Sequence, residues 1–352
     1  MDEGVSAAYT RLDLYNLARI LWRREANMTL YYVLLRLWSH LGDSVAWYRA
    51  LSLIFSVATL PMLYAVGKRL FGTIAGLIAA LLFAVNAYSV RYAQDARSYS
   101  LAIFLVTAST YFFVRAVETG KRSDWKWYIV VSALSVYAHF FSVLVIPAHW
   151  LSLRALQNDP QTSSIYADFV KAAKRIALWT IPVWIFIVTT GVGTLRWMHR
   201  PGLSELCGFV EQYAGNGGWR LLCLYAVCFV LAAATGIRSW KAYGRSLQTW
   251  RYVLVFGWFL LPVIIPLAVT LIKPVFLARY VSICLPGLIL AVAAGVSSLK
   301  YRLTSLTALA VIVWLAIGGV RSYYAQDFDL LRQEYRDVAT FVLANAKPGD
   351  AI

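Results

Sequence analysis

The chain has 352 residues, of which 60% are hydrophobic and only 14% are charged, and its mean hydropathy is +0.62. Because a soluble domain carries about a quarter charged residues, this composition excludes an ordinary soluble protein and indicates a membrane protein. The net charge of +16 does not predict nucleic-acid binding, since the basic residues form short clusters between apolar runs without interleaved stacking aromatics. The four cysteines form no CxxC pair, so neither a zinc site nor a disulfide framework is predicted.

The apolar runs predict membrane-spanning helices. A helix needs about 20 apolar residues to cross the hydrocarbon core, where it satisfies its own backbone groups, and the runs lack the period-2 alternation of a membrane β-barrel. Before the first run, residues 30–41 predict an amphipathic helix at the membrane interface. Ten spans are then predicted, of which the fourth and fifth form a short helical pair: 47–67, 72–92, 99–117, 127–138, 141–156, 176–194, 221–237, 252–272, 281–298 and 303–320.

Basic clusters between these spans predict the orientation. Short cytoplasmic loops are rich in Lys and Arg, and with ten alternating spans the following clusters share one side, predicted to be cytoplasmic: Lys68-Arg69, Lys121/Arg122/Lys126, Lys171/Lys174/Arg175, Arg238/Lys241/Arg245/Arg251 and Lys300/Arg302. Both chain ends and the acidic clusters then face outward, together with the loop 195–220, a candidate acceptor-binding lid, and a predicted helix at 333–346. The fold class is therefore predicted as all-α, a polytopic transmembrane helical bundle with non-cytoplasmic loops and tail.

Short motifs follow one another along nearly the whole chain: Asp2-Glu3, Leu30-Tyr31-Tyr32, Leu35-Arg36-Leu37-Trp38, Gly42-Asp43-Ser44, Arg49-Ala50-Leu51-Ser52, Gly67-Lys68-Arg69-Leu70-Phe71-Gly72, Tyr92-Ala93-Gln94-Asp95-Ala96-Arg97-Ser98-Tyr99, Tyr137-Ala138-His139-Phe140-Phe141, Pro274-Val275-Phe276, Arg279-Tyr280 and Leu285-Pro286. Their order and spacing resemble those of the GT-C class of polytopic glycosyltransferases. The resemblance is strongest to bacterial family-39-like enzymes, whose relatives include protein O-mannosyltransferases and the aminoarabinose transferases of lipid A.

The chain departs from this family pattern in two places. Family members have a His-Pro-Pro before the Leu-Tyr-Tyr motif, whereas this chain has Asn27-Met28-Thr29. They also have a transmembrane helix before the Asp-Glu pair, so the resemblance implies an N-terminally truncated sequence and eleven or more spans in the full protein. We expect residues 1–320 to form the transmembrane GT-C module without its first helix, and residues 321–352 to begin a non-cytoplasmic C-terminal segment.

The resemblance implies that acidic residues near the start and near position 95 carry the chemistry. Asp2 is the candidate general base, and Glu3 is expected to orient it or to contact the acceptor. From the residues alone, the ordinary alternative is that Asp2 and Glu3 are simply a charged chain terminus. Asp95 is expected to position the acceptor, Asp2 or a divalent cation, and Arg97 to reach the donor phosphate. The ordinary alternative is a helix cap and an arginine that extends to the interface, yet charges at membrane depth are costly and usually functional.

The remaining candidates bind the substrate. Lys273 and Arg279 flank an aromatic turn and suit capture of the leaving phosphate, although interfacial anchoring explains Lys273 about as well. The motif residues Tyr99 and Tyr280 belong to the same substrate-binding set, as does His139, for which a satisfied structural histidine is the competing interpretation. No metal ligands, and no cofactor beyond an optional divalent cation, are predicted.

The resemblance thus implies an inverting membrane glycosyltransferase at the plasma (inner) membrane, with its active site facing the periplasm or cell exterior. Its partners would be membrane lipids, a polyprenyl-phosphate sugar donor, with mannose as the sugar suggested by relatives, and a lipid, protein or glycan acceptor hydroxyl. Two other functions stay open. One is a transporter or flippase of lipid-linked saccharides, which would place ionisable residues near the bilayer midplane and show repeated halves. The other is a non-catalytic protein that binds a lipid-linked sugar.

Overall fold

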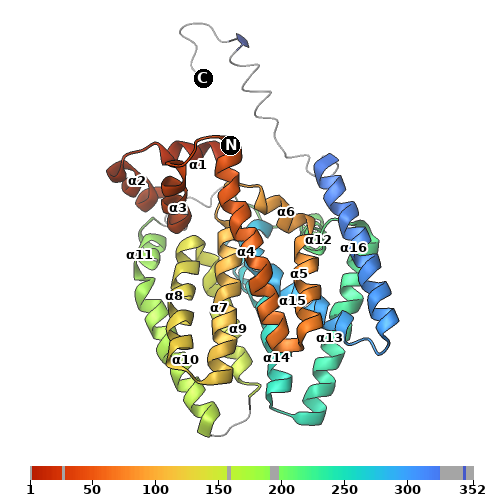
Figure 1. Cartoon of the computed structure of the whole chain (residues 1–352). Coiled ribbons are helices and arrows are strands. Elements are labelled where there is room, and N and C mark those ends of the chain that lie inside the picture. The colour runs from red at the N-terminus through yellow and green to blue at the C-terminus, as the bar shows by residue number, and fades with distance from the viewer. Residues whose placement is uncertain (1, 26–27, 157–159, 191–197, 326–343, 346–352) are drawn as a thin grey trace.

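The computed structural model describes residues 2–25, 28–156, 160–190, 198–325 and 344–345. These residues form a bundle of helices, and none of them lies in a β-strand. The all-α bundle predicted from the sequence is confirmed (Figure 1). The helices are α1 (Asp2–Thr10), α2 (Leu14–Ile20), η1 (Leu21–Glu25), α3 (Thr29–Ser39), α4 (Val45–Phe71), α5 (Thr73–Ala84), α6 (Ala87–Ala93), α7 (Tyr99–Thr119), α8 (Arg122–Ala138), η3 (Phe140–Leu144), α9 (Val145–Leu153), α10 (Pro160–Trp179), α11 (Ile181–Thr190), α12 (Leu203–Ala214), α13 (Gly218–Tyr243), α14 (Leu247–Thr270), η5 (Ala278–Cys284), α15 (Leu285–Ser297) and α16 (Arg302–Ala325).

The ten predicted spans fall mainly on helix, but they are not ten equal spans. Six helices are long and apolar enough to cross a membrane among the described residues, and eight segments are if the bent pairs α5–α6 and α10–α11 each count once. Those pairs bend by 62° and 53°. The two predicted short spans are α8 and η3–α9, which meet near His139. α16 continues to Ala325, past the predicted domain boundary at 320, and the predicted helix at 333–346 lies almost entirely outside the described residues.

Small residues let the long helices approach closely. A Cβ atom added to Gly67 of α4 would stand 2.8 Å from the Cα of Gly76 in α5, and one added to Gly295 of α15 would stand 1.9 Å from the carbonyl oxygen of Cys228 in α13. Because lipid offers no hydrophobic driving force between helices, such backbone contact is a main source of helix association in membranes. All four cysteines are free, and Cys228 and Cys284 are buried packing residues.

Polar side chains inside the bundle satisfy one another. The two ring nitrogens of His149 lie 3.1 Å from the hydroxyls of Thr110 and Tyr128, and its ring stacks on Phe113 with centroids 4.3 Å apart. A buried polar group costs free energy unless it is hydrogen-bonded. His149 is therefore a satisfied polar residue of the bundle interior.

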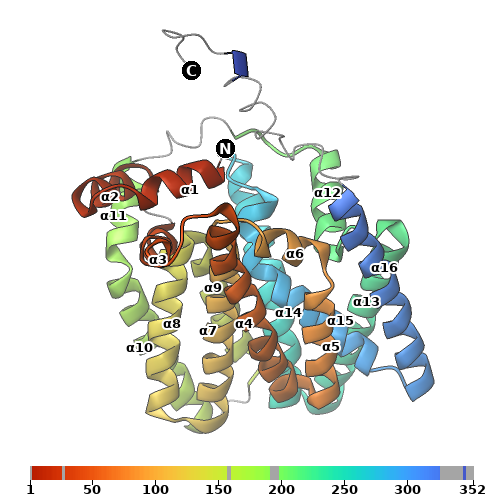
Figure 2. The same cartoon turned by 45° about the horizontal axis from the view of Figure 1, so that its top comes forward.

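The bundle has two different ends. Helices α1–α3, α6 and α12 lie at one end, where the chain begins, whereas the connections α4–α5, α7–α8 and α13–α14 lie at the other (Figures 1 and 2). Those connections carry three of the five basic clusters that the sequence assigned to a common side, whereas Lys171, Lys174 and Arg175 lie within α10. α3 matches the predicted amphipathic helix, with Tyr31, Tyr32 and Leu35 buried. The loop predicted as a candidate lid contains α12, a regular helix.

Candidate active site

The turn between α6 and α7 carries the first candidate residues. α6 begins at Asn86, whose Oδ1 accepts hydrogen bonds from the backbone N–H groups of Tyr88 and Ser89 at 2.9 and 3.2 Å. This cap starts a new helix at an angle to α5. The chain then turns through Asp95 and Arg97 before α7, so both residues lie at the same end of the bundle as α1.

Arg97 is a buried cation, with only 7% of its surface exposed. Its Nη1 donates a hydrogen bond to the Tyr32 hydroxyl at 3.1 Å, and its carbonyl accepts one from the Ser52 hydroxyl at 3.3 Å. The ring of Tyr32 packs against Tyr9 of α1 with centroids 5.1 Å apart. Because a buried charge is expensive, Arg97 remains a candidate binding residue.

Aromatic rings surround His139, which is 1% exposed. Its ring centroid lies 5.9 Å from that of Tyr99 and 5.4 Å from that of Tyr280, and Phe140 and Phe141 are similarly close. Neither ring nitrogen has a hydrogen-bond partner among the described residues. Burial, followed by the positive charges of Arg97 and Arg279, lowers the pKa of His139 to about 3, so the imidazole is neutral at physiological pH.

Arg279 approaches the same rings from the other half of the chain. The hydroxyls of Tyr88 and Tyr213 donate hydrogen bonds to the Ala278 carbonyl at 2.9 and 2.8 Å, which fixes the start of η5. The Arg279 guanidinium lies 5.7 Å from the Tyr280 ring centroid. Arg97 and Arg279 both act electrostatically on Tyr99 and on His139. Two cations far apart in sequence therefore converge on one aromatic cluster.

Asp95 adds a carboxylate to this group. It is half-buried, and it acts electrostatically on Tyr31 and on Tyr92. Tyr92 also interacts with Arg279 and packs against Tyr99, with ring centroids 4.8 Å apart. The structure thus brings Asp95 and Arg279 to a shared ring, that of Tyr92.

Three predicted residues are not placed in this cluster. Lys273 is exposed, in the loop after α14. Asp2 and Glu3 begin α1, but their side chains lie outside the described residues. α1 reaches the cluster indirectly. Its Tyr9 packs against Tyr32 of α3, and the Tyr32 hydroxyl accepts the hydrogen bond from Arg97. Within the described part of the chain, no group of three His, Cys, Asp or Glu residues is close enough to hold a metal ion.

Comparisons with known proteins concern the family resemblance and the fold. The sequence model of the dolichyl-phosphate-mannose-protein mannosyltransferase family matches residues 28–186. The fold is similar to the crystal structure of ArnT from Cupriavidus metallidurans in the apo state, with a TM-score of 0.55 and 12% identity over 87% of this chain and 57% of that chain. Residues 28–186 are thus similar to the O-mannosyltransferases, and the fold is similar to that of ArnT. No curated protein sequence matches this chain.

A second solved structure shares the fold. The oligosaccharyltransferase of Archaeoglobus fulgidus, in complex with zinc and sulfate, gives a TM-score of 0.53 and 13% identity over 83% of this chain and 44% of that chain. The chain therefore spans about half the length of these two structures. The family match includes Asp95, Arg97 and His139 and ends before Arg279.

The sequence did not assign a role to three tyrosines that build the cluster. Tyr32 lies in the Leu-Tyr-Tyr motif, but its bond to Arg97 depends on how α3 crosses the end of α7. Tyr88 and Tyr213 hold the Ala278 carbonyl from two different helices. No pattern along the chain pairs these residues, although a buried tyrosine usually needs a partner for its hydroxyl.

Proposed function

We propose that this protein transfers one sugar, with mannose as the first candidate, from a polyprenyl-phosphate donor to an acceptor hydroxyl on the non-cytoplasmic side. The observation that carries the proposal is the convergence of Arg97 and Arg279 on Tyr99 and His139, with Asp95 beside them. Two cations at one end of a membrane bundle suit a phosphate that leaves with negative charge. The matched family is described as using a dolichyl-phosphate mannose, which supports both the donor class and the sugar.

In this reaction the acceptor oxygen attacks the anomeric carbon of the sugar. The new carbon–oxygen bond forms as the bond between that carbon and the phosphate oxygen breaks, and the phosphate keeps the electron pair. A carboxylate takes the acceptor proton, typically for a rate gain of about 10²–10⁴. We assign this base to Asp2, with Glu3 and Asp95 orienting it or the acceptor. A single displacement of this kind inverts the anomeric carbon.

The positively charged residues act on the leaving group. Arg97 and Arg279 stabilise the developing phosphate charge in a site that largely excludes water, where such charge stabilisation is strongest. Arg presents a planar fork to phosphate, whereas Lys273 in the exposed loop would add a flexible point charge. The neutral His139 ring both donates and accepts hydrogen bonds, so it suits a sugar hydroxyl between the walls formed by Tyr99 and Tyr280.

We place the site on the periplasmic or exterior face of the plasma (inner) membrane. The basic connections lie at the end of the bundle opposite α6 and α12 (Figure 1). Since short cytoplasmic loops are enriched in Lys and Arg, the basic end belongs in the cytoplasm. Asp95 and Arg97 then face outward, where the donor is a lipid-linked sugar and the acceptor is a lipid, a protein or a glycan.

Release of free polyprenyl phosphate tests the proposal. Full-length protein in nanodiscs is incubated with polyprenyl-phosphate mannose and with an extract of the cell envelope as the source of acceptors. We expect release that depends on the extract and that Asp2→Asn abolishes. The matched control is Asp13→Asn, because Asp13 is the exposed N-cap of α2 and asparagine caps equally well.

Two results would contradict the proposal. Movement of the intact donor across the bilayer without release of polyprenyl phosphate would identify a transporter. Donor binding without release, for a panel of polyprenyl-phosphate sugars and in the presence of extract, would identify a non-catalytic binder. Full activity of the Asp2→Asn protein would remove Asp2 from the mechanism and leave the family assignment intact.

A further inference from the structure

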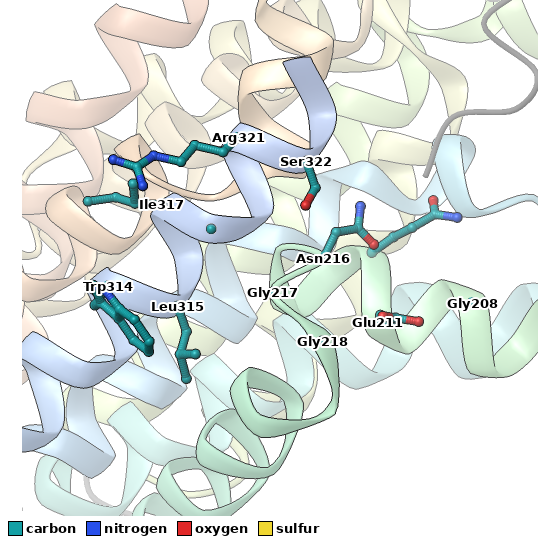
Figure 3. Close-up of a pocket in the computed structure, with 12 residues that line it drawn as sticks. Gly208, Glu211, Asn216, Gly217, Gly218, Trp314, Leu315, Ile317, Arg321 and Ser322 are labelled. Atoms are coloured by element: carbon teal, nitrogen blue, oxygen red, sulfur yellow. The ribbon is translucent and has the colours of Figure 1, made fainter. Parts of the chain in front are cut away.

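A half-open hollow of about 800 Å³ lies between α16 and the turn that joins α12 to α13 (Figure 3). Its lining contains none of the residues of the cluster around His139. The volume falls within the range of roughly 300–1,000 Å³ that small-molecule sites occupy. The hollow is therefore a separate candidate site, and the proposed transfer reaction does not account for it.

The hollow is formed by a close approach of two backbones. The turn places Gly215, Asn216 and Gly218 at φ values of +103°, +52° and +74°, which glycine adopts without strain and asparagine tolerates as a single residue. A Cβ atom added to Gly319 of α16 would stand 2.1 Å from the Gly215 carbonyl oxygen, and one added to Gly217 would stand 2.7 Å from that of Leu315. Direct contact between backbones holds α16 against the turn and leaves a defined space beside it.

The lining changes from apolar to polar along α16. Trp314 and Leu315 lie below, and Arg321 and Ser322 lie about two helical turns further on, at the end of the helix where it leaves the bundle (Figure 3). α16 is a candidate membrane span, and Trp314 is 69% exposed on its surface. The apolar part of the hollow therefore opens toward lipid, and the polar part lies at the level of the head groups.

The polar groups suit a neutral ligand with several hydroxyls. Glu211, Gln212 and Asn216 line the hollow from α12 and the turn after it, and Arg321 lines it from α16. These four side chains are planar, and each has two or more polar atoms able to donate or accept hydrogen bonds. The single carboxylate balances the single guanidinium, so the lining has no net charge and does not favour an anionic phosphate head group.

We propose that this hollow binds the saccharide head group of a membrane glycolipid, with the planar polar side chains on the sugar hydroxyls and the lipid chains along Trp314. The Trp314 ring provides an apolar face with a polar edge, which suits the boundary between chain and sugar. The claim concerns binding alone, and it holds or fails independently of the proposed transfer.

Photo-crosslinking tests this site with the full chain in nanodiscs and without any sugar donor. The probe is a monoglucosyl diacylglycerol with a diazirine in one acyl chain, compared with phosphatidylglycerol that carries the same chain. We expect the glycolipid to label peptides from residues 203–218 and 302–325 about tenfold more than the phospholipid does. The phospholipid lacks the sugar hydroxyls, so it loses their hydrogen bonds to the charged lining residues.

Gly318→Leu is the blocking variant, because Gly318 lines the hollow and a Cβ atom added there meets no heavy atom within 4 Å. We expect it to remove the labelling without unfolding the protein, and Arg321→Gln to reduce it about tenfold. The control is Arg302→Gln at the opposite, exposed end of α16, which should leave labelling unchanged.

Three results would overturn the proposal. Equal labelling by phosphatidylglycerol would mean that the hollow accepts acyl chains whatever the head group. Labelling that survives Gly318→Leu would place the glycolipid elsewhere on the bundle. Competition by excess soluble methyl glucoside, with no preference for the lipid-linked form, would identify a site for free saccharides.

Discussion

The hydrogen bond between Arg97 and Tyr32 gives the most direct test of the phosphate site. Tyr32→Phe removes the hydroxyl that accepts from Nη1 of Arg97 at 3.1 Å, and it keeps the ring that packs on Tyr9. Arg97→Gln removes the cation itself. If Tyr32 acts by holding the guanidinium in place, the two substitutions must not have independent effects on phosphate binding.

The magnitudes follow from burial. Both side chains are nearly inaccessible, at 7% exposure for Arg97 and 1% for Tyr32. A hydrogen bond to a charged group contributes about 1.5–3 kcal/mol, so Tyr32→Phe should weaken the binding of polyprenyl phosphate by about tenfold or more. Removing one partner of a buried charge pair costs about 2–5 kcal/mol, so Arg97→Gln should weaken it at least about 30-fold. In the Arg97→Gln protein, Tyr32→Phe should add almost nothing.

The assay is the dissociation constant of polyprenyl phosphate for the protein in nanodiscs, measured by native mass spectrometry. This lipid is the proposed leaving group whatever the sugar. Tyr128→Phe is the matched control, since the Tyr128 hydroxyl is buried and also lies 3.1 Å from its partner, but that partner is His149 inside the bundle. The reasoning would be refuted if Tyr32→Phe lowered the affinity equally in the wild-type protein and in the Arg97→Gln protein. It would also be refuted if Arg97→Gln left the affinity unchanged.

Two further predictions concern matched pairs of residues. His139→Phe should keep the unfolding midpoint, because neither ring nitrogen has a partner in the described structure, and should reduce sugar transfer at least about tenfold. His149→Phe should instead lower the midpoint, because it removes the hydrogen-bond contacts of the ring with the buried Thr110 and Tyr128 hydroxyls. The opposite pattern in calorimetry and transfer assays would make His139 structural. Gly319→Ala should destabilise the protein by about 1–3 kcal/mol, because the added Cβ atom meets the backbone of the facing turn. Gly318→Ala, at the neighbouring position, should be neutral or stabilising by up to about 1 kcal/mol. Equal unfolding midpoints of the two variants would contradict the close approach of α16.

Much of the architecture could be predicted because hydrophobic runs of membrane length have few alternatives. Each predicted span falls mainly on helix in the structure, and the amphipathic segment before the first span is α3. The number of spans could not be predicted in the same way, because length and composition do not show where a helix bends. The breaks after Ala84 and at Thr180 divide two predicted spans into angled pairs, and local capping by Asn86 decides the first of them.

The sequence by itself determined the membrane class, the places of the helices and the common end of the basic connections, since these follow from composition and spacing along the chain. It also identified Asp95, Arg97, His139 and Arg279 as candidates through motif order. Only the tertiary structure decided that these groups share one aromatic cluster and that Tyr32 and Tyr213 support it. The same holds for the hollow beside Gly319. The physical reason is that contacts between helices depend on crossing angles and on small residues that meet across the bundle, and a one-dimensional pattern contains neither.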